Sequence, residues 1–215
     1  SMGSINLDGV NDYISTTKSY STPTNFTLSL WFKADPTASN GALMTFGSSQ
    51  TGSSSSYMHR RLYMSGGKIY FGIWNSGVGW NTINSAASYN DGQWHQVAAT
   101  LTGNVMKLYM DGNFETSLTA SGTTVNYTGY WKIGSAESVF AYHFKGLLDD
   151  VRIYSSEISS QQIRDLAALD DTPIVTDDFF ANLNSSNVLS FTELTYNLGL
   201  NSTQCFYGTT PKYCG

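Results

Sequence analysis

The sequence has little charge. Only 13% of its 215 residues are Asp, Glu, Lys or Arg, against about a quarter in an average soluble domain. The one adjacent basic pair, Arg60-Arg61, is expected to lie on the surface at the start of a strand. A nucleic-acid-binding domain needs a basic face, so the net charge of −5 and the lack of basic runs exclude that function. With 14% aromatic residues, the composition is typical of an adhesive or ligand-binding extracellular surface.

Long apolar runs and cysteines are also scarce. No uninterrupted apolar stretch reaches the roughly 18 to 20 residues of a membrane-spanning helix, so we expect no membrane insertion. Residues 1–4 are typical of a cloning scar and are left out of the fold prediction. Cys205 and Cys214 lack the C-x-x-C spacing of a metal or redox motif. We predict that they form a disulfide; the alternative is two free thiols in a reducing cell.

A dense series of β-turns occupies residues 91–115. Asp111-Gly112 is typical of a two-residue hairpin loop that needs positive φ at both positions, and two more turn dipeptides precede it, Asp91-Gly92 and Gly103-Asn104. Residues 94–101 and 105–110, between these turns, are rich in strand formers. The stretch therefore predicts consecutive antiparallel strands.

Other segments carry the two-residue period of strands. Residues 26–32 place Phe or Leu at every second position, which predicts a strand with one face on a core. Residues 61–75 predict a hairpin with Gly66-Gly67 as its turn. Residues 76–85, S-G-V-G-W-N-T-I-N-S, predict a glycine-flexible loop that carries Trp80.

One short helix is predicted after residue 158. Ser159 is a candidate N-cap with Gln162 three positions later, which is the spacing of a capping box. Ile163, Leu166 and Ala167 would share one face and dock a helix of about three turns on the edge of the sheets.

Three segments of the chain resemble laminin G-like domains, within the concanavalin A-like lectin/glucanase superfamily. D-G-Q-W-H-Q-V-A followed by L-Y-M-D-G is similar to the central signature of these domains, N-F-T-L-S-L-W-F-K to their second strand, and G-L-L-D-D-V-R-I-Y to their last strand. The resemblance covers residues 5–169. It implies an all-β fold, a two-sheet antiparallel jelly-roll sandwich with one short C-terminal helix.

The character of the chain changes after residue 169. D-D-T-P, residues 170–173, is a charged boundary with a proline, and short strand candidates follow in an Asn-, Ser- and Thr-rich background that does not resemble the family. We predict that residues 5–169 form the sandwich and that residues 170–215 form a small disulfide-closed extension packed on it. The alternative is that the extension belongs to a neighbouring domain.

Catalysis is not expected. Laminarinase-type hydrolases of the resembled superfamily set two glutamates and an aspartate at alternate positions of one strand, because a nucleophile and an acid must lie about 5 Å apart on one face. No Glu-x-Asp or Asp-x-Glu includes any of the four glutamates, Glu115, Glu137, Glu157 and Glu193. A G-x-S-x-G motif is absent, and no acidic residue stands at a suggestive spacing from His59, His95 or His143.

A calcium site is predicted from strand parity. Asp149 shares the parity of the apolar residues on the last strand, and Asp12 shares that of the apolar residues on the first, so both carboxylates are expected to point toward the core and to need a partner. Asp8 lies in the adjacent turn. Carboxylates and turn carbonyls suit Ca²⁺ rather than zinc, and the resemblance also implies a structural calcium near these strands. The alternative is that Asp149 and Asp12 only accept backbone N–H bonds in strand-end turns.

Ligand recognition is predicted from exposed aromatic residues beside amides. A sugar site combines an aromatic platform for C–H faces with groups that bond to hydroxyls. The segment around Trp80 supplies this set, with Trp80 itself the residue expected to be exposed; the candidate contacts are Trp80, Asn81, Asn84, Tyr57 and Trp74. A second platform is Tyr130 with Trp131. Because Trp74 and Trp131 lie in predicted strands, the competing prediction places both in the core.

The sequence thus predicts a non-catalytic, secreted or cell-surface module that binds a glycan or a cell-surface glycoconjugate. Two alternatives stay open, a protein-binding adhesion or receptor module and a structural tip or spacer domain of a surface appendage. The protein-binding alternative predicts a large exposed apolar patch without an aromatic groove.

Overall fold

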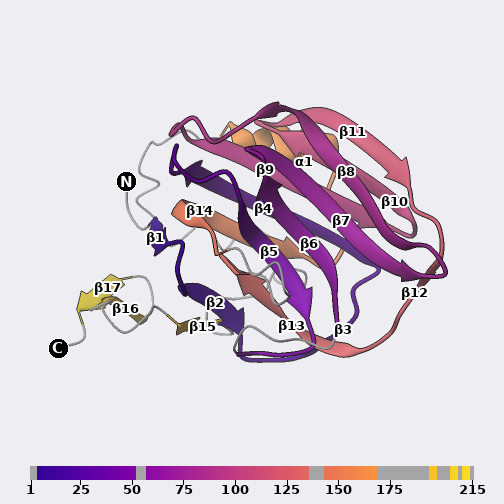
Figure 1. Ribbon diagram of the computed structural model, residues 1–215, viewed down its shortest axis with the longest axis horizontal. Helices are drawn as coiled ribbons and strands as arrows, with labels where there is room; N and C mark the ends of the chain where they lie inside the picture. The colour runs from indigo at the N-terminus through magenta and orange to yellow at the C-terminus, as the bar shows by residue number, and fades with distance from the viewer. Residues whose placement is uncertain are drawn as a thin grey trace.

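The computed structural model describes residues 4–51, 57–135 and 143–168, together with the backbone of three short strands between residues 194 and 213. Two antiparallel sheets pack face to face (Figure 1). The first sheet has six strands in the order β1 (Ile5–Asp8), β14 (Lys145–Tyr154), β4 (Asn25–Ala34), β9 (His95–Thr102), β10 (Val105–Met110) and β11 (Asn113–Thr119).

The second sheet has nine strands. Its main path runs β12 (Thr123–Thr124), β7 (Lys68–Ser76), β6 (Met58–Ser65), β5 (Gly41–Gly47), β13 (Thr128–Ile133), β2 (Tyr13–Thr16) and β15 (Leu194–Asn197). Two strands lie off this path, β3 (Tyr20–Ser21) on β13 and β8 (Gly79–Ser88) on β7. The two-sheet antiparallel sandwich predicted from the sequence is confirmed.

The core lies between the sheets and is built by strand alternation. On β4, Phe26, Leu28, Leu30 and Phe32 are all fully buried, as their period predicts. The ring of Phe26 meets the second sheet edge-on, 6.0 Å from the ring centre of Phe71. Each such large apolar side chain contributes roughly 1.5–3 kcal/mol by leaving water. The sandwich is therefore held mainly by these inward rows.

The turn-rich stretch folds as expected, and it fixes a histidine. Asp111 and Gly112 have φ of 50° and 75°, as the hairpin requires. His95 lies between two carboxylates, with Nδ1 3.0 Å from Asp111 Oδ2 and Nε2 3.2 Å from Asp91 Oδ1. The expectation that no acid partners His95 is therefore wrong, because two turns bring both acids to it. The Asp-His-Asp arrangement ties the two turns together.

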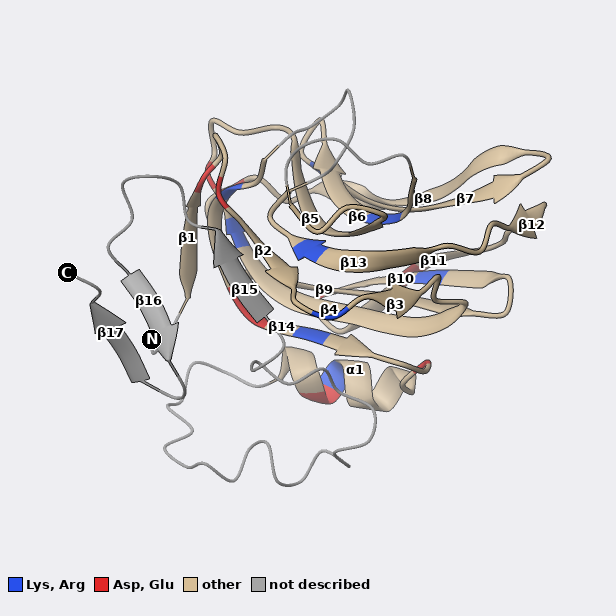
Figure 2. Ribbon diagram, turned by 90° about the horizontal axis from the view of Figure 1, so that it is seen from below, with Lys and Arg blue, Asp and Glu red and all other residues tan. Residues whose placement is uncertain are grey.

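Helix α1 (Ser160–Ala167) covers the side of the first sheet that faces away from the second (Figure 2). The capping box is confirmed, since Ser159 Oγ accepts from the Gln162 amide and the Gln162 side chain accepts from the Ser159 amide. Ile163 and Leu166 are buried against outward-facing residues of the first sheet, Ala98, Tyr109 and Tyr154. With eight residues, the helix is shorter than the three turns predicted. In the part of the chain that the structure describes, no helix is long and apolar enough to span a bilayer.

One predicted loop is a strand instead. Residues 79–88 form β8, which pairs with β7 through a tight turn at Gly77 and Val78. The apolar period is weak because β8 pairs only with β7 within the second sheet, and only Ile83 and Ser85 along it are buried. A segment of mostly polar, exposed residues can therefore still form a strand when its backbone hydrogen bonds are made to a single neighbouring strand.

Beyond residue 168 the structure describes backbone only. Strand β15 pairs with β2, and β16 (Gln204–Tyr207) and β17 (Thr210–Tyr213) form a hairpin in which Cys205 lies opposite Lys212. Cys214 and the side chain of Cys205 lie outside the described residues. The disulfide and the domain boundary at residue 170 both stay predictions.

Candidate ligand-binding face

The outward side of strands β6, β7 and β8 carries a continuous set of aromatic and polar side chains. Register places Tyr63 beside Tyr70 and Tyr70 beside Asn84 in one row, and Arg61 beside Gly72 and Gly72 beside Thr82 in the next. The inward residues of the same strands, such as Leu62, Phe71 and Ile83, belong to the core. We call this outward set the aromatic face; its members are His59, Arg61, Tyr63, Tyr70, Gly72, Trp74, Trp80, Thr82 and Asn84.

Arg61 and Trp80 form the centre of the aromatic face. The Arg61 guanidinium carbon lies 3.6 Å from the centre of the Trp80 ring and 4.6 Å from that of Tyr63. Gly72 lies beneath the pair, since a Cβ there would come within 3.2 Å of Arg61 Nε and 3.3 Å of Trp80 Cε3. The missing side chain at Gly72 thus lets the indole and the guanidinium stack close to the sheet. Contacts of this kind contribute about 0.5–1 kcal/mol at exposed sites and more when desolvated.

A second group of rings lies at one end of the face. His59 stacks on Trp74 at 4.6 Å and meets Tyr57 and Tyr127 edge-on. Burial, and next the neighbouring Arg60 charge, lower the pKa of His59 to about 4. The imidazole is therefore neutral at physiological pH and acts as a flat ring that orders Trp74. Tyr57 is 46% exposed and stacks on Tyr127.

Arg60 points the opposite way from Arg61. It is 0% exposed, so the expectation of a surface residue is wrong for Arg60. Its guanidinium donates to the carbonyl oxygens of Pro23 and His59 at 3.1 and 2.9 Å. Burial lowers the pKa of Arg60 to about 10, which still leaves it charged. Arg60 thus joins β6 to the turn before β4, whereas Arg61 lies on the opposite, outward side of the strand.

The structure brings together part of the predicted ligand set. Trp80, 38% exposed, shares the face with Trp74 and with Asn84, although these residues lie on strands rather than in a loop. Tyr57 lies at the edge of the same group through His59. These residues remain the predicted contacts.

One predicted contact is wrong, and two others lie apart from the aromatic face. Trp131 is 3% exposed and packs between Phe26 and Phe46 in the core, so it cannot serve as a surface platform. The Asn81 side-chain amide bonds to the backbone of Ser121, donating at 3.1 Å and accepting at 2.9 Å, and so joins β8 to the segment before β12; its contact with a ligand stays a prediction. Tyr130, half-buried on β13 opposite Gly47, lies outside the aromatic face.

Sequence reasoning missed Arg61, Tyr63, Tyr70 and His59. Alternation could have found them, because Leu62 and Met64 are the apolar positions of H-R-R-L-Y-M and leave His59, Arg61 and Tyr63 on the other side. The same parity in K-I-Y-F-G-I-W puts Tyr70, Gly72 and Trp74 outward.

The three aspartates predicted to bind calcium do not form one site. Asp8 pairs with Lys145, so Asp149 lies four residues further along β14, about 13 Å away at roughly 3.3 Å per residue. The parity argument for Asp149 is wrong because a bulge between Asp149 and Arg152 shifts the register, with φ of 49° at Asp150. Leu148 and Ile153 both face the core although five positions separate them.

Asp8 and Asp12 do lie together in the turn between β1 and β2. Asp12 Oδ2 accepts from the Asp8 amide at 3.1 Å, and Asp8 Oδ1 accepts from the Val10 amide at 2.7 Å. The bond to Asp12 is one that the alternative prediction expects, and Asp149 Oδ1 likewise accepts from the Asp150 amide at 2.7 Å. Among the described residues, no group of three His, Cys, Asp or Glu could hold a metal ion. Calcium at this turn stays a prediction that the described carboxylates do not strengthen.

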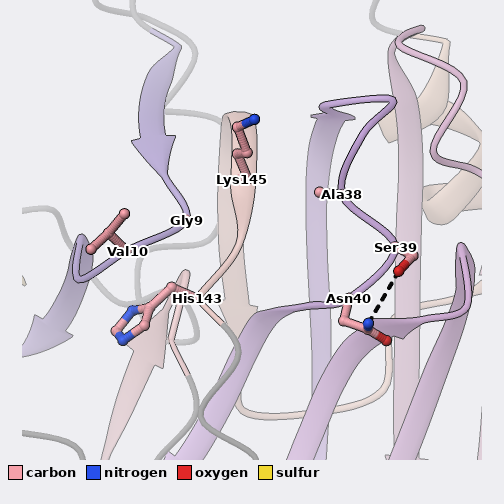
Figure 3. Close-up of a pocket in the computed structure, with 7 residues that line it drawn as sticks. All are labelled: Gly9, Val10, Ala38, Ser39, Asn40, His143 and Lys145. Atoms are coloured by element: carbon pink, nitrogen blue, oxygen red, sulfur yellow. Dashed lines mark hydrogen bonds between the residues drawn. The ribbon is translucent and has the colours of Figure 1, made fainter.

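A small cavity of about 290 Å³ lies beside that turn (Figure 3). It is lined by Gly9, Val10, Ala38, Ser39, Asn40, His143 and Lys145. The Lys145 ammonium pairs with Asp35 at 3.0 Å, and the Asn40 amide bonds to Ser39 and to the Gly66 amide. Nδ1 of His143, also in the lining, is buried without a hydrogen-bond partner. The cavity has no Trp or Tyr in its lining to serve as a platform for a sugar ring, so the aromatic face is the better candidate site.

The chain matches the model of a known protein family. A family model of laminin G type, described as the Concanavalin A-like lectin/glucanases superfamily, matches residues 8–164. The chain belongs to this superfamily. The resemblance predicted from the sequence is thereby confirmed. No curated protein matches the sequence.

Solved structures with the same fold include binding modules. A heptameric SAP-like pentraxin from Limulus polyphemus shares 15% identity over 91% of this chain and 92% of that chain, with a TM-score of 0.63. The CBM40 of Ruminococcus gnavus IT-sialidase, bound to α2,3-sialyllactose, shares 16% identity over 76% and 96%, with a TM-score of 0.62. Domains LG4-5 of the mouse laminin α1 chain share 20% identity over 70% and 40%, with a TM-score of 0.55. At these identities the likeness shows the fold alone.

Proposed function

We propose that this protein is a non-catalytic carbohydrate-binding module at the cell exterior and that a glycan lies on the aromatic face. The observation that carries the proposal is the exposed Trp80 ring held against Arg61, with Asn84 and Thr82 on the same strand and side. An indole offers a flat apolar surface to sugar C–H groups, while amides and hydroxyls bond to sugar hydroxyls.

The build of the face supports this function. Trp80, Trp74, Tyr63 and Tyr70 come from three adjacent strands, so their backbones are fixed by sheet hydrogen bonds. Tyr63 and Tyr70 stack at 5.2 Å, which limits their side-chain freedom before a ligand arrives. A preordered site loses less entropy on binding than a flexible one.

The comparisons support the same class of function. The module of R. gnavus IT-sialidase has this fold and was solved with sialyllactose. An extracellular location fits a family that includes laminin domains and a composition with little charge. A structural Ca²⁺ at the Asp8–Asp12 turn would be an addition to this function and is not required by the aromatic face.

A protein-binding module is the weaker alternative. Large exposed aliphatic and Phe side chains of the described residues fall at three places: the turn after β1 with Val10, the tip of the β7–β8 hairpin with Val78, and the paired strands β10 and β11 of the other sheet with Val105, Phe114 and Leu118. Protein-binding sites usually show a contiguous apolar patch. The described surface therefore favours a sugar over a protein partner.

The test is a glycan array followed by titration of the strongest binder with Trp80→Ala. We expect binding to weaken at least tenfold, about 1.4 kcal/mol, while the free energy of unfolding changes by about 1 kcal/mol or less because the indole is partly exposed. Phe114→Ala, which removes a 57% exposed ring from the first sheet, is the matched control and should bind like the wild type. Equal binding by both variants, or no binding to any glycan with and without calcium, would refute the proposal.

A further inference from the structure

The second sheet holds only positive charge. None of its nine strands contains Asp or Glu, whereas Arg60, Arg61, Lys68 and Lys132 all lie in them. The whole chain has a net charge of −5, so this distribution opposes the average of the protein. In Figure 2 the acidic residues of the described strands appear on the first sheet, on β1, β11 and β14. Of these cations, Arg60 and Lys132 are buried, while Arg61 and Lys68 are partly exposed. Glu115 of β11 accepts from the Ala86 amide at 3.0 Å, so a carboxylate does reach β8, but at Ala86 and not at Arg61.

Arg61 is the cation at the centre of the aromatic face, and no carboxylate of the described residues pairs with it. Lys107, Lys145 and Arg152 each contact a carboxylate at 3.0 Å or less, with Glu157, Asp35 and Asp150 as partners. Within the described part of the chain, Arg61 makes no such pair, and its Nε is buried without an acceptor. Burial lowers the pKa of Arg61 below its usual value, and the titratable group that opposes this is the Tyr63 phenol. The guanidinium is thus partly desolvated and lacks an anion.

Stacking leaves the guanidinium prepared for an anion. The guanidinium lies over the rings of Trp80 and Tyr63, and its Nε is buried. The Nη groups have no hydrogen-bond acceptor among the described residues, so they are the donors left for a ligand. The planar fork of N–H donors matches the two oxygens of a carboxylate or a sulfate, and such charge-assisted bonds are about twice as strong as neutral ones. A stacked guanidinium also loses little freedom when it binds.

We propose that the aromatic face binds an acidic saccharide and that Arg61 donates hydrogen bonds to its anionic group while Trp80 contacts its ring. This inference rests on the proposed function and adds the charge class of the ligand. A carboxylate sugar and a sulfated sugar share the required chemistry. The experiment separates these two sources of the anion.

The test is an array that carries each oligosaccharide in four forms: neutral, with a carboxylate, with that carboxylate methyl-esterified, and with a sulfate. For the wild type we expect esterification to weaken binding at least tenfold and added salt to weaken binding of the acidic form. A stronger response to the carboxylate or to the sulfate form identifies the anion. Equal binding of the acidic form and its ester would overturn the inference without any variant, and if the neutral form also binds and depends on Trp80, the proposed function still stands.

Arg61→Gln should remove the preference for the acidic form, and Arg61→Lys should restore part of it because the charge returns without the fork. Arg164→Gln, on the exposed side of α1, makes the same charge change on the far side of the sandwich and should leave the preference intact. Gly72→Ala tests the same assignment at a second position. The added Cβ would push Arg61 and Trp80 outward, and Gly72 does not have the positive φ that would itself disfavour alanine. A preference for the acidic form that persists in both Arg61→Gln and Gly72→Ala would contradict the assignment to Arg61.

Discussion

The outward faces of the two sheets are built differently. On the first sheet, α1 covers Ala98, Tyr109 and Tyr154, and lysine and arginine side chains pair with carboxylates. On the second sheet, the strands β6 to β8 present rings, amides and an arginine without a carboxylate. The first face is completed by the protein's own helix and ion pairs. Among the described residues, no helix covers the second face and no carboxylate pairs with Arg61, which is the expected state of a surface that meets a ligand.

The largest effect on stability should come from a substitution beneath helix α1, which covers the outward side of the first sheet. Ile163 is fully buried under α1, so Ile163→Ala leaves a cavity between the helix and the first sheet. We expect a loss of about 2–5 kcal/mol in the free energy of unfolding, with unchanged affinity for glycan at a temperature where the variant is folded. Urea unfolding and titration of the same preparation measure both quantities. A weakened affinity in the folded variant would show that the two faces are not independent.

The adjacent arginines give the sharpest contrast between inside and outside. Arg60→Met strips charge-assisted bonds from buried carbonyl oxygens and should cost about 1.5–3 kcal/mol of stability. Arg61→Met removes the same charge from the surface and should cost about 1 kcal/mol or less, but it should weaken binding of the acidic ligand. Equal stability losses for the two variants would mean that the opposite orientations do not matter.

Two histidines should make opposite contributions to the pH dependence of stability. Hydrogen bonding to Asp111 raises the pKa of His95, so its contribution to stability is complete below about 6.5 and is lost as pH rises through the folded value. His59, with its pKa lowered to about 4, is neutral in the fold, so stability is lost as pH falls from about 6.5 toward 4. Each limb should change Tm by a few degrees, as expected for about 1 kcal/mol in a chain of this size.

Thermal melts between pH 4.5 and 8.5 check these two contributions. His95→Gln should flatten the alkaline limb alone, and His59→Phe should flatten the acid limb alone. Flattening of the wrong limb by either variant would contradict the assignment of its protonation state.

The smallest expected effect concerns calcium. Because Asp149 lies about 13 Å from Asp8 by register, Asp149→Asn should leave any difference between the Tm in calcium and the Tm in chelator as it is in the wild type. Asp12→Asn is the comparison, since Asp12 belongs to the β1–β2 turn. Loss of a wild-type calcium response in Asp149→Asn alone would restore Asp149 as a ligand.

The sandwich was predictable because its signals are local and strong. The Phe and Leu alternation of β4, the Asp111-Gly112 hairpin and the Ser159 capping box each determine structure within a few residues. The aromatic face was predictable only in part. Trp80 and Asn84 could be proposed from composition. However, Ile83 is the only buried apolar residue on β8, so the two-residue period of this strand could not be seen in the sequence.

The remaining errors come from interactions that single positions do not encode. The inward placement of Arg60 depends on carbonyl acceptors such as Pro23, which lies 37 positions away. The orientation of Asp149 depends on a bulge that shifts the register of β14 against β4. A charged residue on a strand can thus point either way until its distant partners are known.

The most direct test of the open second face is chemical-shift mapping by NMR with the strongest glycan from the array. We predict that the largest changes occur at the indole N–H of Trp80, the guanidinium Nη–H groups of Arg61 and the amides of β7 and β8, with the amides of α1 and β14 unchanged. Changes centred on Gly9, Val10 and Lys145 at the β1–β2 turn, with the Trp80 indole unaffected, would contradict it.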